Sequence, residues 1–309
     1  MTNVAIVTGG DKNYFPMIAE LIKSVRALDD KEVANWDFCV IDAGLTEEQH
    51  NYLKDECAEI VRPEWPTKDG SEPARVNGRN YIKADVCRPF IPTYFSNQYD
   101  VFFWIDSDCW VQNAEGLRLF VQGALQDKLA VLAVADRCWP RGDRVQWLGP
   151  LPIKAKTFYY SNALKAFDRK MARQLFPHHT LSAGVFALKR TAPHWKVWQE
   201  WTLKGLVKGN PFTSGQLGLG ITHYIEKLPA AFVPAWAHWL CQHTPAWDEQ
   251  RQQFVETHLP HRALSILHLT GWDAMRKDRS LTIDVTTTEG KIIQKSLRYD
   301  GFDGEGLEL

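Results

Sequence analysis

The chain has 309 residues and a net charge of −1, with 24% charged residues. It therefore lacks the strong positive charge of a typical nucleic-acid binder, and no nucleic-acid partner is expected. No apolar run approaches the roughly 20 residues that a membrane-spanning helix needs, and the N-terminus shows no signal-peptide pattern. We expect a cytoplasmic protein, either free or docked at the inner face of the membrane.

The six cysteines are scattered and include no Cys-x-x-Cys pair. We expect reduced thiols, because disulfide frameworks are typical of short secreted chains. His238, Cys241 and His243 have the residue types of a zinc site, but no fourth ligand follows at a suitable spacing, so zinc is not expected.

The first part of the chain alternates between strand and helix patterns. Residues 4–8 predict a buried strand, residues 16–25 have apolar side chains at helical spacing, and residues 36–41 predict a second strand. Thr46 is the expected N-cap of the next helix, with Gln49 at the capping-box position. Strands that alternate with helices predict an α/β fold with a mostly parallel, doubly wound sheet.

The rest of the chain continues this alternation, and no domain linker is evident. Residues 62–80 and 138–157 are rich in proline, glycine and charge, so both predict loops. The other predicted elements are a proline-interrupted helix at 81–95, strands at 101–105, 129–135 and 181–188, helices at 115–127 and 193–207, a glycine-rich stretch at 210–222 that leads into a helix, and a β-hairpin within 280–298.

Two carboxylates, Asp106 and Asp108, directly follow the apolar strand pattern VFFWI at 101–105. Residues i and i+2 of a strand point to the same side, so both could face one point at the edge where α/β sheets bind ligands. A divalent cation would relieve their mutual repulsion, and oxygen ligands suit Mg²⁺ or Mn²⁺. The alternative is an ordinary turn after a strand, where Asp and Ser are common.

A series of short blocks follows along the chain, namely IVTGGDKNY (6–14), WIDSD (104–108), LAVAD (132–136), LSAGVFAL (181–188), the region of Gln216, and LHLTGW (267–272). In composition and order these blocks resemble those of glycosyltransferase family 8. The resemblance implies a GT-A fold, a mostly parallel sheet flanked by helices, over residues 1–277. Residues 278–309 would form a C-terminal β-hairpin and tail.

The same resemblance implies a retaining hexosyltransferase of polysaccharide biosynthesis. It would use Mn²⁺ or Mg²⁺ to move a hexose from a UDP-sugar to a hydroxyl of a saccharide or glycoconjugate acceptor. The metal would be held by Asp106 and Asp108 of the Asp-x-Asp motif, with His268 as the third ligand. Without the family context, a histidine after an apolar run is more often a hydrogen-bonded core residue.

Basic residues would stabilise the diphosphate that leaves. The resemblance points to Arg88 or Lys83 before the Asp pair. After His268, Gly271 matches the family's His-x-x-Gly block. The family's following lysine falls at Ala274 here, so the cation would have to be Arg276 or Lys277. Surface solvation is the alternative for each of these cations.

The nucleotide would lie at the end of the first strand. By resemblance, Asp11 and Asn13 bind the base and Tyr14 stacks on uracil, which fits the hydrogen-bonding groups and the aromatic face of these side chains. Thr8 and Gly9 would let the backbone approach the nucleotide. The alternative is a simple turn followed by a core aromatic residue.

Two further residues, Asp136 and Gln216, would contact the donor sugar, with Gln216 near the anomeric carbon. Ser182 stands where the family usually has Asn, and Gly215 and Leu217 stand where acidic residues are usual. A covalent intermediate would need a carboxylate nucleophile, and none is evident beside Gln216. By resemblance, front-face attack by the acceptor is therefore favoured. The same departures leave open a catalytically degenerate protein that binds nucleotides or saccharides.

Other patterns leave further alternatives open. An Asp-x-Asp phosphotransferase is disfavoured, because Trp110 occupies the position of its usual threonine and the motif is central rather than N-terminal. Trp195, Trp198 and Trp201 have helical spacing, which predicts a buried helix or, alternatively, a peripheral membrane contact. Residues 236–247 would line the acceptor cleft or belong to the core. The oligomeric state is open.

Overall fold

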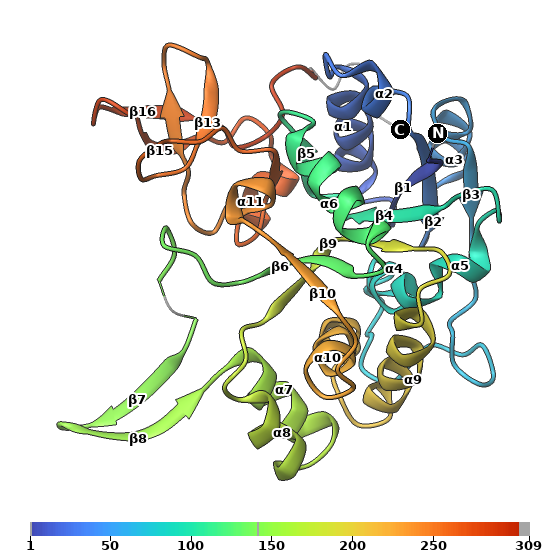
Figure 1. The fold of residues 1–309 in the computed structure, drawn as a ribbon. Coiled ribbons are helices and arrows are strands. Elements are labelled where there is room, and N and C mark those ends of the chain that lie inside the picture. Colours follow the sequence, from blue (N-terminus) through green and yellow to red (C-terminus); the bar gives the residue numbers. More distant parts are fainter. Residues whose placement is uncertain (1, 141, 303–309) are drawn as a thin grey trace.

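The structure is a computed structural model that describes residues 2–140 and 142–302 (Figure 1). Its centre is a seven-stranded sheet in the order β10-β6-β9-β4-β1-β2-β3. The strands are β1 (Val4–Gly10), β2 (Asp37–Asp42), β3 (Glu59–Val61), β4 (Val101–Ile105), β6 (Leu129–Ala133), β9 (Leu181–Lys189) and β10 (Ala230–Val233). Only β9 runs antiparallel to its neighbours, so the prediction of a mostly parallel sheet is confirmed.

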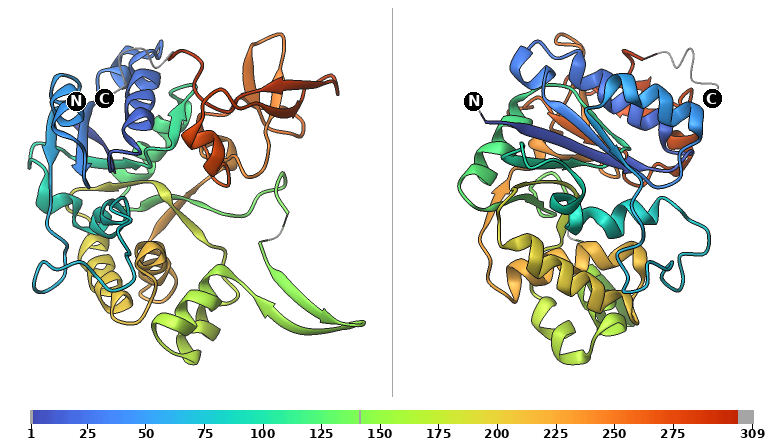
Figure 2. Two further views of the ribbon diagram at one scale, coloured as in Figure 1. Left: turned by 180° about the vertical axis from the view of Figure 1, so that it is seen from behind. Right: turned by 90° about the vertical axis from the view of Figure 1, so that its right-hand side faces the viewer.

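Helices cover both faces of this sheet (Figure 2). One face packs against α1 (Phe15–Arg26) and α6 (Glu115–Leu125), and the other against α4 (Ile82–Cys87), α9 (His194–Leu206) and α10 (Pro211–Tyr224). Along β4, Phe103 is buried in the first of these cores, and Phe102 and Trp104 are buried in the second. This alternation follows from the period of two in a strand, and both faces are apolar because both are covered.

Smaller elements complete the chain. A second sheet joins β11 (Trp239–Leu240), β14 (Ile266–His268) and β5 (Cys109–Val111). The remaining elements are α2 (Lys31–Ala34), α3 (Glu47–Glu56), the 3₁₀ turn Arg88–Phe90, α5 (Ile91–Tyr94), α7 (Phe158–Ala166), α8 (Arg169–Leu175), the 3₁₀ turn Ala235–Ala237, α11 (Asp273–Lys277), and the hairpins β7 (Arg144–Leu148) with β8 (Leu151–Lys156), β12 (Ala246–Asp248) with β13 (Gln253–Val255), and β15 (Ile283–Thr286) with β16 (Ile292–Lys295). Among the described residues, no helix is long and apolar enough to cross a bilayer.

Several local predictions are confirmed. Thr46 and Gln49 form the predicted capping box at the start of α3, and all six cysteines are free. Trp195 and Trp198 are 4% and 0% exposed, so the predicted buried helix is confirmed for these two tryptophans. Trp201 is half-buried and donates from Nε1 to Glu226, so the three do not form an exposed stripe. The predicted C-terminal hairpin is β15–β16, and beyond it the buried Arg298 forms an ion pair with Glu20 of α1.

The prediction of a loop over residues 138–157 was wrong. Residues 144–156 form the β7–β8 hairpin, which turns at Gly149 and Pro150. The turn chemistry of glycine and proline is compatible with a hairpin as well as with a loop. The alternation of polar and apolar residues on either side of Gly149 and Pro150 was the signal for two strands, and the loop prediction overlooked it.

The glycine-rich stretch at 210–222 does not lead into a helix, because it is the helix α10 itself. Glycine serves close packing here. A Cβ on Gly218 would lie 2.8 Å from Thr202 Oγ1 and 3.1 Å from Trp198 Cδ1, both on α9. The small residue therefore lets α9 and α10 approach each other behind the sheet.

Replacing this glycine should destabilise the protein. Alanine gains about 1 kcal/mol of helix propensity over glycine, but overpacking against α9 costs about 1–3 kcal/mol. We expect Gly218→Ala to lower the midpoint of thermal unfolding, while Gly142→Ala, where a Cβ meets nothing within 4 Å, should leave it unchanged. A midpoint for Gly218→Ala at or above that of the wild type would contradict this account of the α9–α10 contact.

Candidate active site

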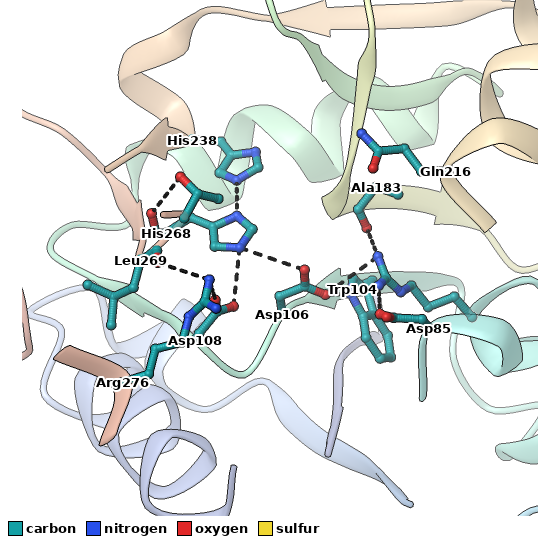
Figure 3. Close-up of polar contacts among 12 residues, drawn as sticks. Asp85, Trp104, Asp106, Asp108, Ala183, Gln216, His238, His268, Leu269 and Arg276 are labelled. Atoms are coloured by element: carbon teal, nitrogen blue, oxygen red, sulfur yellow. Dashed lines mark hydrogen bonds and ion pairs between the residues drawn. The ribbon is translucent and has the colours of Figure 1, made fainter. Parts of the chain in front are cut away.

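The Asp pair lies where two sheets meet. Asp106 follows β4 of the central sheet, Asp108 precedes β5, and His268 ends β14, which pairs with β5. The register sets His268 opposite Cys109, the residue next to Asp108. Residues about 160 positions apart in the chain thus meet at the end of β4 (Figure 3).

The three predicted metal ligands converge. His268 Nε2 lies 3.1 Å from Asp108 Oδ1 and 3.7 Å from Asp106 Oδ2. Taken together, one ligand atom from each residue lies within 4.8 Å of the others. Neighbouring ligands of an octahedral ion with bonds of about 2.1 Å lie about 3 Å apart, so this donor set fits Mg²⁺ or Mn²⁺ after small movements.

Gly184 of β9 leaves the room that this convergence needs. A Cβ at this position would lie 2.5 Å from His268 Cε1 and 2.7 Å from Asp106 Oδ2. The Gly184 carbonyl also accepts a hydrogen bond from the backbone N–H of Asp106 at 2.7 Å. A residue without a side chain therefore allows β9 to pass directly against the ligand set.

His238 supports the imidazole of His268 from behind. Its Nε2 lies 3.0 Å from His268 Nδ1, and the rings are stacked (Figure 3). If Nδ1 of His268 donates this hydrogen bond, its Nε2 is left free to bind a metal, which is the usual arrangement of a metal-binding histidine. Burial lowers the pKa of His238 far below its ordinary value, so this ring stays neutral and can accept.

Two arginines balance the charge of the carboxylates. Arg276 Nη2 lies 2.7 Å from Asp108 Oδ2, and Arg88 Nη1 lies 3.5 Å from Asp106 Oδ1. Arg88 also donates to the carbonyl of Ala183 and forms an ion pair with Asp85. On the other side, Trp104 Nε1 donates to Asp106 Oδ1 at 2.6 Å.

The pKa values of the two aspartates shift in opposite directions. Burial raises the pKa of Asp106, although the charges of Arg88 and His268 oppose this. Burial also opposes the ionisation of Asp108, but the charges of His268 and Arg276 outweigh it and hold its pKa well below the usual range. For His268, burial is outweighed by the carboxylate of Asp108, which raises its pKa.

A cavity of about 1930 Å³ opens over this cluster. It is larger than the few hundred to about 1,000 Å³ of a typical ligand pocket, so it has room for two substrates. The predicted residues that line it are Gly9, Asn13, Tyr14, Arg88, Asp106, Asp108, Ser182, Gln216, His268 and Lys277. Five predicted residues are not among the described residues that line it, namely Thr8, Asp11, Lys83, Asp136 and Gly271.

Three of these five residues make other contacts, and only Asp11 among the three shapes a loop that lines the cavity. The carboxylate of Asp11 accepts from the backbone N–H groups of Asn13 and Tyr81, at 3.0 and 3.2 Å, and so shapes the loop after β1. Lys83 lies over the ring of Trp65 instead of pointing at the Asp pair. Asp136 lies beside Cys138 and Glu256, within 4.8 Å.

Sequence reasoning missed part of the cavity wall. Tyr81 lies 5.3 Å from Tyr14 between ring centroids, and Phe212 lies 6.4 Å from Tyr81, so three aromatic rings line one side. Asp85 also lines the cavity, and its position three residues before Arg88, across the end of α4, was the available signal. Of the two cations proposed after Gly271, Arg276 contacts the Asp pair.

Comparison with known proteins assigns the fold of the chain. No protein-family model matches the sequence, and no curated protein does. The galactosyltransferase LgtC, solved with donor and acceptor sugar analogues, matches with a TM-score of 0.50 and 14% identity, over 86% of this chain and 87% of LgtC. The bifunctional glycosyltransferase WbbM matches with a TM-score of 0.51 and 13% identity, over 87% of this chain and 46% of WbbM. The chain has the GT-A fold of these glycosyltransferases.

Within this GT-A fold, the two aspartates should differ in their effect on stability. Because the pKa of Asp108 is lower in the folded than in the unfolded protein, its ionisation stabilises the fold above pH about 4, and this contribution disappears as the pH falls. Because the pKa of Asp106 is higher in the folded than in the unfolded protein, its ionisation destabilises the fold instead. At pH 7 with EDTA, Asp108→Asn should lower the free energy of unfolding by about 1–3 kcal/mol, and Asp106→Asn by less or not at all. Denaturant unfolding of both variants checks this, and the reverse order would contradict the charge assignment.

Proposed function

We propose that the chain is a metal-dependent, retaining glycosyltransferase of family 8. It would move a hexose from a UDP-sugar to a hydroxyl of a saccharide or glycoconjugate acceptor. The observation that carries this proposal is the convergence of Asp106, Asp108 and His268 at the floor of a large cavity in a chain with the GT-A fold. The motif blocks that resemble family 8 meet around the same cavity.

The charges of the site suit a diphosphate leaving group. A Mn²⁺ or Mg²⁺ ion held by the three ligands would supply positive charge where the diphosphate oxygens become more negative. Arg276 and Lys277 line the cavity on the α11 side, and Arg88 lines it on the α4 side. These cations would hold the diphosphate from both sides and stabilise its departure.

The two halves of the donor would lie on opposite sides of the Asp pair. Tyr14 and Asn13, beside Tyr81, offer an aromatic face and amide groups for uracil. Ser182 and Gln216 line the cavity beyond Asp106, where the hexose would lie. Gln216 Nε2 donates to the carbonyl of Leu181 at 2.9 Å, so its amide oxygen is oriented and available to the sugar.

Retention would follow from attack on the same face of the sugar that the diphosphate leaves. The acceptor hydroxyl would transfer its proton to a diphosphate oxygen, and the amide oxygen of Gln216 would stabilise positive charge on the anomeric carbon. Gly215 also lines the cavity, and its Cβ position is 3.0 Å from the carbonyl oxygen of Asp85. The wall next to Gln216 is therefore closed by backbone and carries no acidic side chain at position 215.

The lack of an acidic side chain at position 215 favours one other candidate, a catalytically degenerate protein that binds a nucleotide or saccharide. Gly215 and Ser182 remove two polar contacts from the sugar side of the cavity. Leu217 does not bear on this question, because it is 1% exposed and packs in the core of α7, α8 and α10. Both candidates predict nucleotide binding, and only the transferase predicts turnover.

Calorimetric titration of UDP tests the shared part of both candidates. We expect binding with Mn²⁺ present and at least tenfold weaker binding in EDTA, because the metal joins the carboxylates to the diphosphate. Asp106→Asn and Asp108→Asn should lose the metal-dependent part of the affinity, whereas Asp143→Asn, an exposed carboxylate at the cavity rim, should not. Equal affinity with Mn²⁺ and with EDTA would reject the metal-dependent site.

Release of UDP from a panel of UDP-sugars separates the transferase from the degenerate protein. We expect slow hydrolysis of one UDP-hexose without an acceptor, because water can replace the acceptor hydroxyl. Gln216→Ala should reduce the rate while UDP affinity stays unchanged. Metal-dependent UDP binding with no release from any UDP-sugar, with or without acceptor saccharides, would favour the degenerate protein.

Gly184→Ala tests the geometry of the metal site by a change that removes no ligand. The added methyl group would overlap His268 and Asp106, so we expect Mn²⁺ affinity, measured by electron paramagnetic resonance, to fall about tenfold or more. Gly142→Ala is the matched control. Unchanged Mn²⁺ affinity in Gly184→Ala would show that the ion binds elsewhere.

A further inference from the structure

The β7–β8 hairpin extends away from the body of the molecule at the edge of the fold, with α7 and α8 beside its base (Figures 1 and 2). A two-stranded hairpin by itself is at best marginally stable in water. This one exposes five large apolar side chains, each between 41% and 66% exposed. They are Val145, Trp147, Leu148, Leu151 and Ile153.

The hairpin has one cationic face. Its register pairs Arg144 with Lys156 and Gln146 with Lys154, so these polar side chains share one side of the ribbon. Arg144, Lys154 and Lys156 line the cavity. The next pair, Val145 with Ala155, belongs to the opposite side because neighbouring residues of a strand alternate. This alternation holds up to Gln146, because the register shifts before Trp147. None of the five exposed apolar side chains is among the described residues that line the cavity, and those at the tip are at least 60% exposed.

Positive charge is concentrated around this hairpin. Residues 142–176 contain seven Lys and Arg but only two Asp and no Glu, in a chain whose net charge is −1. Arg169, Lys170 and Arg173 are exposed on α8, and the apolar side chain of Phe176 is exposed next to them. Lys165 and Leu164 of α7 are also exposed, but both line the cavity. The segment thus combines an apolar tip with a cationic surround.

We propose that the β7–β8 hairpin, with the adjoining surface of α7 and α8, docks on a bilayer that contains anionic lipids. Trp147, Leu148 and Leu151 would enter the interfacial region, where tryptophan and aliphatic side chains are stable. The exposed cations of α8, Arg169, Lys170 and Arg173, would lie against acidic headgroups, which attract Lys and Arg near the membrane surface. A second copy of this chain fits less well, because a two-fold interface would bring the same cationic patches together.

This docking goes beyond the proposed transfer reaction, because it requires neither metal nor nucleotide. It also differs from the tryptophan-rich helix considered from sequence, since Trp195 and Trp198 are buried in the core. The membrane-facing side chains lie instead in a segment that the sequence patterns assigned to a loop.

Co-sedimentation with vesicles, in EDTA, tests the proposal. We expect the full chain to bind vesicles of 70% phosphatidylcholine and 30% phosphatidylglycerol at least tenfold more tightly than pure phosphatidylcholine, and to be released by 0.5 M salt, as expected for screened charges. The triple variant Trp147→Ser, Leu148→Ser, Leu151→Ser should bind at least tenfold more weakly. Its unfolding midpoint should match that of the wild type, because these three side chains are at least 60% exposed.

Matched controls separate this surface from general stickiness. Val207, Leu259 and Ile292 are at least as exposed as the hairpin tip, and their triple replacement by serine should leave vesicle binding unchanged. For charge, Arg169→Glu with Lys170→Glu should weaken binding, whereas Lys54→Glu with Lys196→Glu should not.

Three results would overturn the proposal. The first is no binding of the wild type to the phosphatidylglycerol vesicles. The second is equal binding by the hairpin triple variant and the control triple variant. The third is a wild-type dimer, measured by light scattering, that the hairpin variant converts to a monomer without any difference in vesicle binding. That last result would assign the hairpin to contacts between copies of the chain.

Discussion

The structure of the site depends on placing two carboxylates side by side at the end of a buried strand. Asp106 and Asp108 leave β4 together, and water cannot fully solvate them because β9 and β14 close over them. Uncompensated charge at such a position is costly, so the surrounding residues supply cations and donors. Arg88, Arg276 and Trp104 each contact one of the carboxylates directly.

The surrounding cations compensate the charge of the two aspartates unequally. Asp108 is held ionised by His268 and Arg276, whereas burial of Asp106 is only partly offset. In the proposed function, an added cation would compensate the charge that Arg88 and His268 leave on Asp106. The space left by Gly184 and the hydrogen bond between His268 and His238 would then shape the room that such a cation needs.

The cavity around the Asp pair is lined by segments that are far apart in the sequence. The loop after β1 offers aromatic and amide groups, α10 contributes Gln216, and α11 contributes the cations beyond His268. The β7–β8 hairpin borders the same cavity with Arg144, Lys154 and Lys156 and exposes apolar side chains at its tip. A donor site, an acceptor space and a surface for an anionic bilayer would thus lie in one continuous region.

The sequence by itself determined the features that are local or strongly periodic. The strands at 4–8 and 101–105 and the capping box of Thr46 follow from burial and backbone hydrogen bonding within a few residues. The Asp pair was also readable, because two carboxylates after an apolar strand need a cation or a turn to be tolerated.

Tertiary structure alone decided what depends on contacts between distant segments. The pairing of β14 with β5 brought His268 to the Asp pair, and the position of α11 selected Arg276 as its cation. The glycine-rich stretch forms the helix α10 because α9 packs closely against it. The stability gained from this close packing exceeds the helix propensity that glycine lacks. The cationic and apolar sides of the 144–156 hairpin emerged only from its register, which no local pattern specifies.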